Sequence, residues 1–309
     1  MASVTVVGAG VIGLSCAVRL AEAGHEVRVL ARERPEETTS AVAAALWYPY
    51  LAFPAERVTA WSTTAYREFA RLSETAGPAA GISVRAGTEL LRERQPDPWW
   101  KPAVPDFARL ADPPPGYEDG WRFAAPVIDM AVYLPWLRAR LEELGGGLGH
   151  AELTRLPADP LVVDCAGLGA RELAADPSVA PVRGQVIVLE QVGLDEWCID
   201  DGDAERPCYV VPRTNDIVVG GTAQQGDWNR EPDADTARTI LDRAEAMVPA
   251  IKGARVLRHK VGLRPARPTV RLEAETAAGG GRIVHCYGHG GAGVTLSWGC
   301  ADEVAALVS

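Results

Sequence analysis

The chain has 309 residues, a length that suggests about two domains and allows a sizeable hydrophobic core. Hydrophobic residues make up 47% of it and charged residues 23%, and these globular values exclude a fibrous protein and a wholly disordered one. There are 31 Lys and Arg against 41 Asp and Glu, so the formal net charge is −10 at pH 7. This negative charge disfavours nucleic acid and anionic membrane surfaces as partners.

The six cysteines are scattered along the chain, and no two of them form a CxxC pair. This spacing is typical of reduced, packed thiols rather than of a disulfide framework or a zinc site. A bridge between Cys198 and Cys208 is one alternative, but we expect free thiols. The histidines show no HExxH-type spacing, and neither a secretory signal nor a membrane-spanning run is found, so we expect a cytoplasmic protein without a metal site.

The first elements along the chain form a predicted βαβ unit. Residues 3–7 (SVTVV) are a β-branched apolar run that predicts a buried parallel strand, and the run ends at Gly8. A helix is expected over residues 13–23, because apolar residues recur there at helical spacing and Gly24 can end it. A second strand is predicted over residues 26–31.

Two amphipathic helices are predicted in the middle of the chain, at residues 57–76 and 131–144. Between them, residues 94–120 contain seven prolines and the pair Trp99 and Trp100, which predicts a long surface loop held down by its tryptophans. The second half is predicted to be rich in strands, at 161–164, 184–190, 208–212, 216–222 and 255–261, with a helix at 235–248. It is expected to close with a strand at 282–286, a turn at 287–293 and a helix at 294–307.

A glycine motif, GAGVIG, stands between the first predicted strand and the first predicted helix. The glycines allow a tight turn, a close approach of backbone to a pyrophosphate and close packing of helix on strand. Glu33 follows where a carboxylate binds a ribose, whereas its neighbour Arg32 suits the 2′-phosphate of NADP. FAD or NAD(P) is therefore open from the motif, and the strand-rich remainder favours FAD. The predicted cofactor-binding residues from this motif are Gly8, Ala9, Gly10, Val11, Ile12, Gly13, Arg32 and Glu33.

Eight stretches together resemble the D-amino-acid oxidase family of flavoproteins. They lie at residues 6–15, 38–50, 162–167, 183–185, 208–212, 220–229, 260–273 and 285–303, in the order that the family shows. The resemblance implies an α/β protein with a Rossmann-like FAD-binding domain and an interleaved substrate-binding domain built on an antiparallel sheet. The FAD-binding domain would comprise residues 1–50, 130–184 and 282–309, and the substrate-binding domain residues 51–129 and 185–281.

The resemblance also implies an activity, namely the oxidation of a D-amino acid to an imino acid by hydride transfer from the α-carbon to flavin N5, with oxygen reduced to hydrogen peroxide. Arg264 then looks like the partner of the substrate carboxylate, Tyr209 like its hydroxyl partner, and Gly291 like the backbone group near the amine. This chemistry needs positioning more than a strong base, and a guanidinium can grip a carboxylate through two parallel bonds. Pro265 restricts the backbone of Arg264 and helps to aim its side chain. His289 is interpreted as a packed residue and not as a base.

Further cofactor-binding residues follow from the resemblance alone. They are Thr38, Thr39, Ser40, Ala44, Ala45 and Leu46 near the pyrophosphate and flavin, Leu153 and Ala166 near the adenine, and Gly291, Ala292, Gly293, Val294 and Thr295 under the isoalloxazine. Leu46, Tyr48 and Val211 are expected to line an apolar pocket for the substrate side chain.

The chain departs from the family at two places that bear on its substrate. Glu205 stands where many eukaryotic members have a lid tyrosine, so the lid is predicted to be reduced. Ala223 stands where relatives that act on D-aspartate tend to have arginine, which favours neutral D-amino acids. The expected partners are a small-molecule D-amino acid and oxygen, with a second copy of the chain in a homodimer. The alternatives are a D-aspartate or glycine oxidase, an NAD(P)-dependent reductase, and a flavin-binding scaffold without catalysis.

Overall fold

The strand β1 (Ser3–Val7) lies in the middle of a parallel sheet, as its β-branched apolar run predicts. In the computed structural model, which describes residues 1–49, 52–277 and 279–309, β1 pairs with β2 (Glu26–Ala31) and with β7 (Leu161–Asp164). β6 (Gly147–His150) extends this sheet beyond β2, and β14 (Arg282–His289) extends it beyond β7. The start, middle and end of the chain therefore build one parallel layer.

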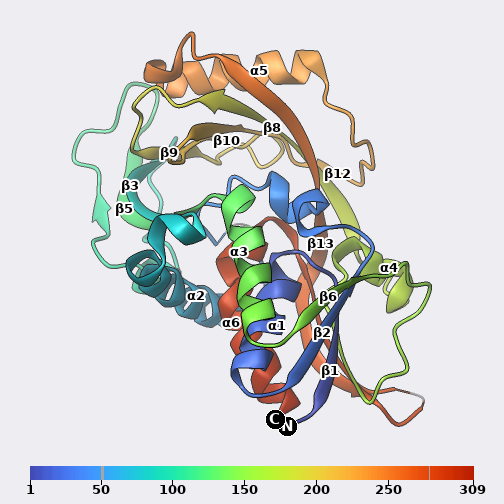
Figure 1. Cartoon of the computed structure of the whole chain (residues 1–309). Helices are drawn as coiled ribbons and strands as arrows, with labels where there is room; N and C mark the ends of the chain where they lie inside the picture. The colour runs from blue at the N-terminus through green and yellow to red at the C-terminus, as the bar shows by residue number, and fades with distance from the viewer. Residues whose placement is uncertain (50–51, 278) are drawn as a thin grey trace.

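Helices α1 (Val11–Glu22), α3 (Met130–Glu143) and α6 (Gly293–Val308) pack together beside this parallel layer (Figure 1). α2 (Ala55–Thr75) lies against α6, where Trp61 donates a hydrogen bond from Nε1 to Glu303 (2.7 Å). Figure 1 places both chain ends side by side at the bottom of the molecule. Shorter helical elements are the one-turn helix α4 (Ala170–Leu173) and the 3₁₀ turns η1 (Pro35–Glu37), η2 (Thr39–Val42), η3 (Gly77–Ala80), η5 (Gly167–Gly169), η6 (Pro249–Ile251) and η7 (Gly290–Ala292).

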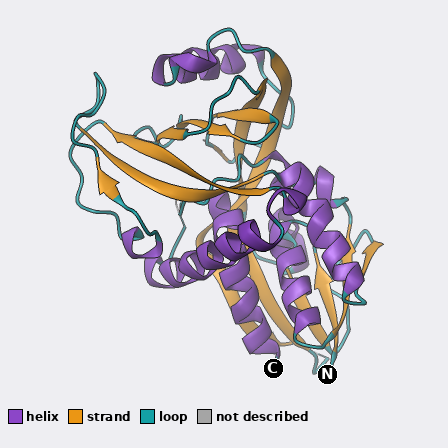
Figure 2. Cartoon of the chain, turned by 60° about the vertical axis from the view of Figure 1, so that its left-hand side comes forward, coloured by secondary structure: helices purple, strands orange, loops and turns teal. Residues whose placement is uncertain are grey.

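The other half of the molecule is an antiparallel sheet. From β8 (Ala180–Glu190) it runs through β11 (Asp216–Gly220), β10 (Cys208–Pro212) and β9 (Trp197–Asp200), and then through β3 (Ile82–Leu91), β5 (Asp119–Ile128) and β4 (Ala108–Arg109). β9 pairs with β3 in parallel, and the short β12 (Gln224–Gln225) pairs with β8. α5 (Ala234–Met247) covers one face of this sheet, where Ile240 packs into a core with Ile187 and Leu189 (Figures 1 and 2).

β13 (Val256–Thr276) joins the two halves. Its first part pairs with β8 and its last part pairs with β14, and the register shifts between Ala266 and Arg271. The strand predicted over residues 255–261 was thus too short. Pro265 and Pro268 lie where β13 passes from one partner strand to the other, at an irregularity that tolerates proline.

The predicted mixed α/β class is confirmed, and most predicted elements agree with the structure to within a few residues. The strands β3, β5, β6 and β9 and the two-residue strands β4 and β12 were missed. Residues 94–120 form the predicted excursion: apart from the turn η4 (Lys101–Ala103), β4 and the start of β5, they contain no regular structure. Residues Tyr50 and Leu51, on which the first predicted domain boundary falls, lie outside the described residues, and the predicted domain limits stay a prediction.

The described residues contain no helix that is both long enough and apolar enough to cross a membrane. All six cysteines are free thiols, as the scattered spacing predicts.

The tryptophan pair of the excursion is divided between core and surface. Trp100 is 3% exposed, and its ring lies against Trp47, Tyr48, Phe107, Trp121 and Phe123. Trp99 is 43% exposed. One tryptophan therefore holds the excursion on the core, and its neighbour does not.

We predict that Trp100→Ala lowers the free energy of unfolding by about 3–5 kcal/mol, because it empties the centre of an aromatic cluster. Trp99→Ala is the matched control and is expected to change that free energy by less than about 0.5 kcal/mol. Urea unfolding of both variants measures the difference. An equal loss of unfolding free energy in the two variants would contradict the conclusion that Trp100, and not Trp99, holds the excursion on the core.

Candidate active site

A cavity of about 380 Å³ runs between the parallel and antiparallel halves. Its lining comes from segments throughout the chain, including the turn after β1, the turn after β14, β10 and β13. Nearly all predicted site residues line it, namely Gly8, Ala9, Gly10, Val11, Ile12, Arg32, Glu33, Thr38, Thr39, Ser40, Ala44, Ala45, Leu46, Tyr48, Leu153, Ala166, Tyr209, Val211, Arg264, Gly291, Gly293, Val294 and Thr295. Gly13 and Ala292 are buried outside the lining.

The turn after β1 brings backbone directly to the cavity. Gly8 has a φ of +109°, and a Cβ there would collide with the carbonyl oxygen of Cys165. A Cβ on Gly13 would collide with the carbonyl oxygen of Gly8, so Gly13 allows α1 to pack on β1 from outside the lining. Ser40 accepts a hydrogen bond from the backbone N–H of Val11 (3.0 Å) at the start of α1. This glycine cradle at a helix N-terminus suits a pyrophosphate.

Glu33 is an acidic residue of the cavity wall. Its Oε1 lies 3.4 Å from Nη2 of Arg32 and 3.5 Å from Nη1 of Arg230. Leu153 and Ala166 also line the cavity. Of the three arginines in the lining, two are therefore paired with the same carboxylate.

The turn after β14 supplies a second stretch of backbone. Gly291 is exposed in the turn η7, whereas Ala292 is fully buried. Thr295, in the first turn of α6, donates a hydrogen bond to the carbonyl oxygen of Tyr48 (2.9 Å) and accepts one from the N–H of Tyr48 (3.1 Å). The predicted glycine-rich turn and the predicted substrate-pocket segment are thus tied together.

Arg264 and Tyr209 lie side by side in the cavity wall, on the strands β13 and β10. Nη1 of Arg264 donates to the carbonyl oxygen of Thr222 (2.8 Å), and no carboxylate of the described residues forms an ion pair with Arg264. Burial raises the pKa of the Tyr209 phenol, and the charge of Arg264 beside it opposes that rise. An unpaired guanidinium and a protonated phenol thus face the cavity, and both can donate to an anionic group.

Three glycines make room for this pair, and sequence reasoning did not assign them. A Cβ on Gly184 of β8 would lie 2.5 Å from Nη2 and 2.6 Å from Cζ of Arg264. A Cβ on Gly220 of β11 would collide with the ring of Tyr209, and one on Gly221 would lie 2.8 Å from its hydroxyl oxygen. All three lie in stretches that carry the family resemblance, RGQ and GGT, so the sequence contained a signal for them.

A phenol and two carboxyl groups form a hydrogen-bonded group at another part of the wall, where Tyr48 and Asp201 line the cavity and Glu89 is buried behind them. The Tyr48 hydroxyl lies 2.7 Å from Oε1 of Glu89 and 3.0 Å from Oδ2 of Asp201. Leu46, Tyr48 and Val211 line the cavity as predicted, but this wall is not wholly apolar. We call Tyr48, Glu89 and Asp201 the acidic group. Sequence reasoning missed Glu89 and Asp201, because only the pairing of β3 with β9 brings them together.

Burial, and next the charge of Asp201, raise the pKa of Glu89 to about 8. Burial also raises the pKa of Asp201, with a smaller contribution from the charge of Asp200. A phenol has one proton and can donate only one of its two hydrogen bonds to an acidic neighbour. A proton held by Glu89 at neutral pH supplies the other bond, and Tyr48 then donates to the Asp201 carboxylate.

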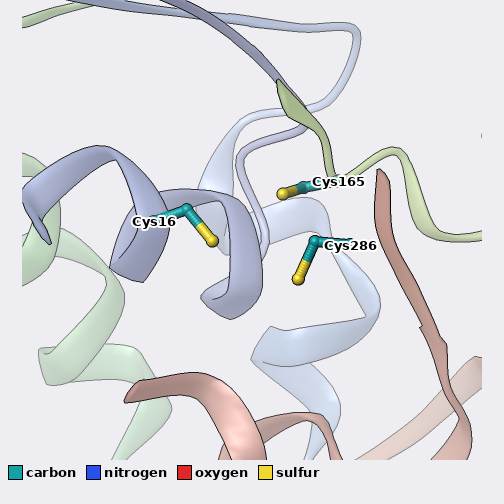
Figure 3. A group of neighbouring side chains, drawn as sticks. All are labelled: Cys16, Cys165 and Cys286. Carbon is teal, nitrogen blue, oxygen red and sulfur yellow. The ribbon is translucent and has the colours of Figure 1, made fainter. Parts of the chain in front are cut away.

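His289 and a thiol cluster lie behind the turn after β14. Burial lowers the pKa of His289 to about 4, so its imidazole is neutral at physiological pH. The sulfur atoms of Cys16, Cys165 and Cys286 point toward one another within 4.8 Å (Figure 3). The thiols of Cys16 and Cys286, together with burial, raise the pKa of Cys165 well above its usual value. Thiols in this state pack as small apolar side chains and would have to lose protons to ligate an ion.

Residues 3–307 match the family described as FAD dependent oxidoreductase. The chain belongs to this family. The oxidoreductase is 51% identical to a D-amino-acid oxidase of Rubrobacter xylanophilus, over 99% of this chain and 96% of the relative. It is 36% identical to a human D-aspartate oxidase, over 100% and 95% of the two chains. Its fold is similar to that of glycine oxidase from Bacillus cereus, with a TM-score of 0.82 and 19% identity over 99% of this chain and 94% of that one.

The cofactor of this oxidoreductase is FAD, as predicted. The cavity has features that such a ligand requires, since the Gly8 and Gly13 positions admit no side chain and Glu33 provides a carboxylate near the end of β2. The residues that would hold FAD are the predicted cofactor-binding residues that line the cavity, the first being Gly8 and the last Thr295. Their individual roles stay a prediction.

The raised pKa of Glu89 predicts a pH-dependent stability. Between its unfolded value of about 4.5 and its folded value of about 8 the folded state holds one more proton than the unfolded state. The free energy of unfolding therefore falls as pH rises, by about 1 kcal/mol per pH unit from this group. Denaturant unfolding of the wild type and of Glu89→Gln, from about pH 5 to about pH 8, measures this effect. The free energy of unfolding of the wild type minus that of Glu89→Gln is expected to decrease as the pH rises.

Glu74→Gln, at an exposed position of α2, provides the control and is expected to show a difference that does not vary with pH. A difference between the wild type and Glu89→Gln that is constant over this range would show that Glu89 titrates normally.

Proposed function

We propose that this protein is an FAD-dependent D-amino-acid oxidase that acts on neutral D-amino acids. The observation that carries the proposal is the unpaired Arg264 guanidinium beside the Tyr209 phenol in the wall of the cofactor cavity. The relatives named D-amino-acid oxidase support it. The products would be an imino acid, which water converts to a 2-oxo acid and ammonia, and hydrogen peroxide formed from oxygen.

In this proposal the chain's residues bind and orient the substrate. Arg264 pairs with the substrate carboxylate through two N–H groups, and Tyr209 donates its hydroxyl proton to the same carboxylate. The backbone at Gly291 lies beside the substrate amine, which reacts as the neutral form. FAD, when bound, accepts the hydride of the α-carbon. Positioning supplies most of the rate, because no strong base is required and the buried neutral imidazole of His289 is not one.

A neutral substrate is favoured over D-aspartate by the charges of the cavity wall. Its three cationic residues are Arg32 and Arg230, both beside Glu33, and Arg264, which would hold the α-carboxylate. None of the described cations in the wall is thus left for a second carboxylate. Ala223 is buried and does not line the cavity, so its lack of charge does not act directly on the substrate side chain. The carboxylate of Asp201, which does line it, would repel an acidic side chain.

Anaerobic mixing with a substrate tests the activity. D-valine is expected to bleach the yellow flavin colour, whereas L-valine leaves it unchanged. Arg264→Ala is expected to lower kcat/KM for D-valine by about 10- to 100-fold, from the loss of a charge-assisted hydrogen bond of about 1.5–3 kcal/mol. Its flavin absorbance is expected to persist.

Arg258→Ala is the matched control, because Arg258 also lies on β13 but is not part of the cavity wall. A flavin that no D-amino acid bleaches, or an Arg264→Ala variant with unchanged kcat/KM, would refute the proposal.

Gly184 provides a subtler test of the same geometry. In Gly184→Ala the new methyl group displaces the Arg264 guanidinium, which is the flexible end of a side chain, so activity is expected to fall while stability is kept. We expect kcat/KM for D-valine to fall about 10- to 100-fold and the melting temperature to stay within about 4 °C. Gly147→Ala is the control, since nothing lies within 4 Å of a Cβ there. Unchanged kcat/KM in Gly184→Ala would show that Arg264 need not keep this position.

A further inference from the structure

We infer that Asp201, at the cavity face of the acidic group, is a specificity-determining residue that binds a positive charge at the end of the substrate side chain, so that D-amino acids with an ammonium or guanidinium group on a long unbranched side chain depend on it for their binding. This inference rests on the proposed function, because it takes the α-carboxylate to lie on Arg264. Asp201 is the residue that would contact the distal cation.

The position of Asp201 follows from the register of the antiparallel sheet. Tyr209 of β10 is directly opposite Ile199 of β9, and both line the cavity. Asp201 is the first residue after β9, two residues beyond Ile199, and it lines the cavity as Ile199 does. Residues in this diagonal relation in a sheet lie about 7–8 Å apart at the backbone. A substrate held at Tyr209 therefore has Asp201 within the reach of an unbranched side chain.

The wall between these points suits the apolar stem of such a side chain. Leu46, Ile199 and Val211 line the cavity together with Tyr209 and Asp201. A lysine side chain presents four methylene groups along its length and carries its charge only at the tip. The methylene groups of such a side chain would pack against the aliphatic residues, and its terminal cation would contact the Asp201 carboxylate.

The acidic group lacks a cation of its own. Among the hydrogen bonds and ion pairs of the described residues, no Lys, Arg or His contacts Glu89 or Asp201. Glu89 is only 2% exposed, and its Oε2 has no hydrogen-bond partner. The raised pKa values of both carboxyl groups have the same origin, because burial opposes their ionisation and no positive charge offsets it. A ligand cation would provide the missing charge.

The test compares D-lysine with D-norleucine, which has the same four-carbon side chain without the ammonium group. At about pH 7 the lysine ammonium is charged. In the FAD-loaded enzyme, Asp201→Asn is expected to lower kcat/KM for D-lysine about tenfold or more and to change kcat/KM for D-norleucine less than about twofold. Most of the loss for D-lysine is expected in KM, because the contact is made equally in the ground state and the transition state.

Asp203→Asn is the matched control. Asp203 lies in the same short segment, pairs with Arg206 and is not part of the cavity wall, so both rates are expected to be unchanged. Equal losses for D-lysine and D-norleucine in Asp201→Asn would overturn the inference, because Asp201 would then act on a group that all substrates share. A wild type that oxidises D-norleucine but not D-lysine would overturn it as well.

Failure of the proposed function itself is recognised separately. In that case neither D-lysine nor D-norleucine bleaches the flavin. The equilibrium binding of each compound is then measured from the change that it causes in the flavin absorbance. Tighter binding of D-lysine to the wild type than to Asp201→Asn, with equal binding of D-norleucine, would still support the subsite. Equal binding of D-lysine to both proteins would refute it.

Discussion

An arginine that is held in place without an ion pair is the constraint around which the cavity is organised. The Arg264 guanidinium rests on the bare backbone of Gly184 and donates to the carbonyl oxygen of Thr222. Thr222 is itself buried, and its hydroxyl accepts a hydrogen bond from the N–H of Gln185. A neutral carbonyl orients the guanidinium but leaves its charge uncompensated. A half-buried cation without a counter-charge favours an anionic ligand.

The charges of the cavity wall fall into two sets. Arg32 and Arg230 surround Glu33, and that carboxylate is already compensated. Among the described residues, Arg264 has no carboxylate partner and Asp201 has no cationic one. A zwitterion with an added distal charge matches the second arrangement, and a substrate with two carboxylates does not. Selectivity in such a site comes as much from the unmatched charge as from shape.

The buried polar residues outside the cavity hold its walls in position. Arg183 is a buried residue of β8, and its guanidinium donates to Gln224, Gln185 and the carbonyl oxygen of Asn229. The motif RGQ therefore does two things: its glycine makes room for Arg264, while its polar residues fasten the segment after β12. A buried network of this kind rigidifies a site only when its members are satisfied.

Local features of the sequence were sufficient for the elements and for the cofactor end of the cavity. The glycine turn, its flanking strand and helix, and the βαβ order follow from short-range sterics, and the structure contains them. The acidic group was beyond such reasoning, because Tyr48, Glu89 and Asp201 are far apart in the chain and meet only through the pairing of β3 with β9. Likewise, the space that Gly184 leaves for Arg264 exists only because β8 and β13 are neighbours. Local sterics can be read from neighbouring residues, whereas charge pairing and the fit of side chains depend on contacts between distant ones.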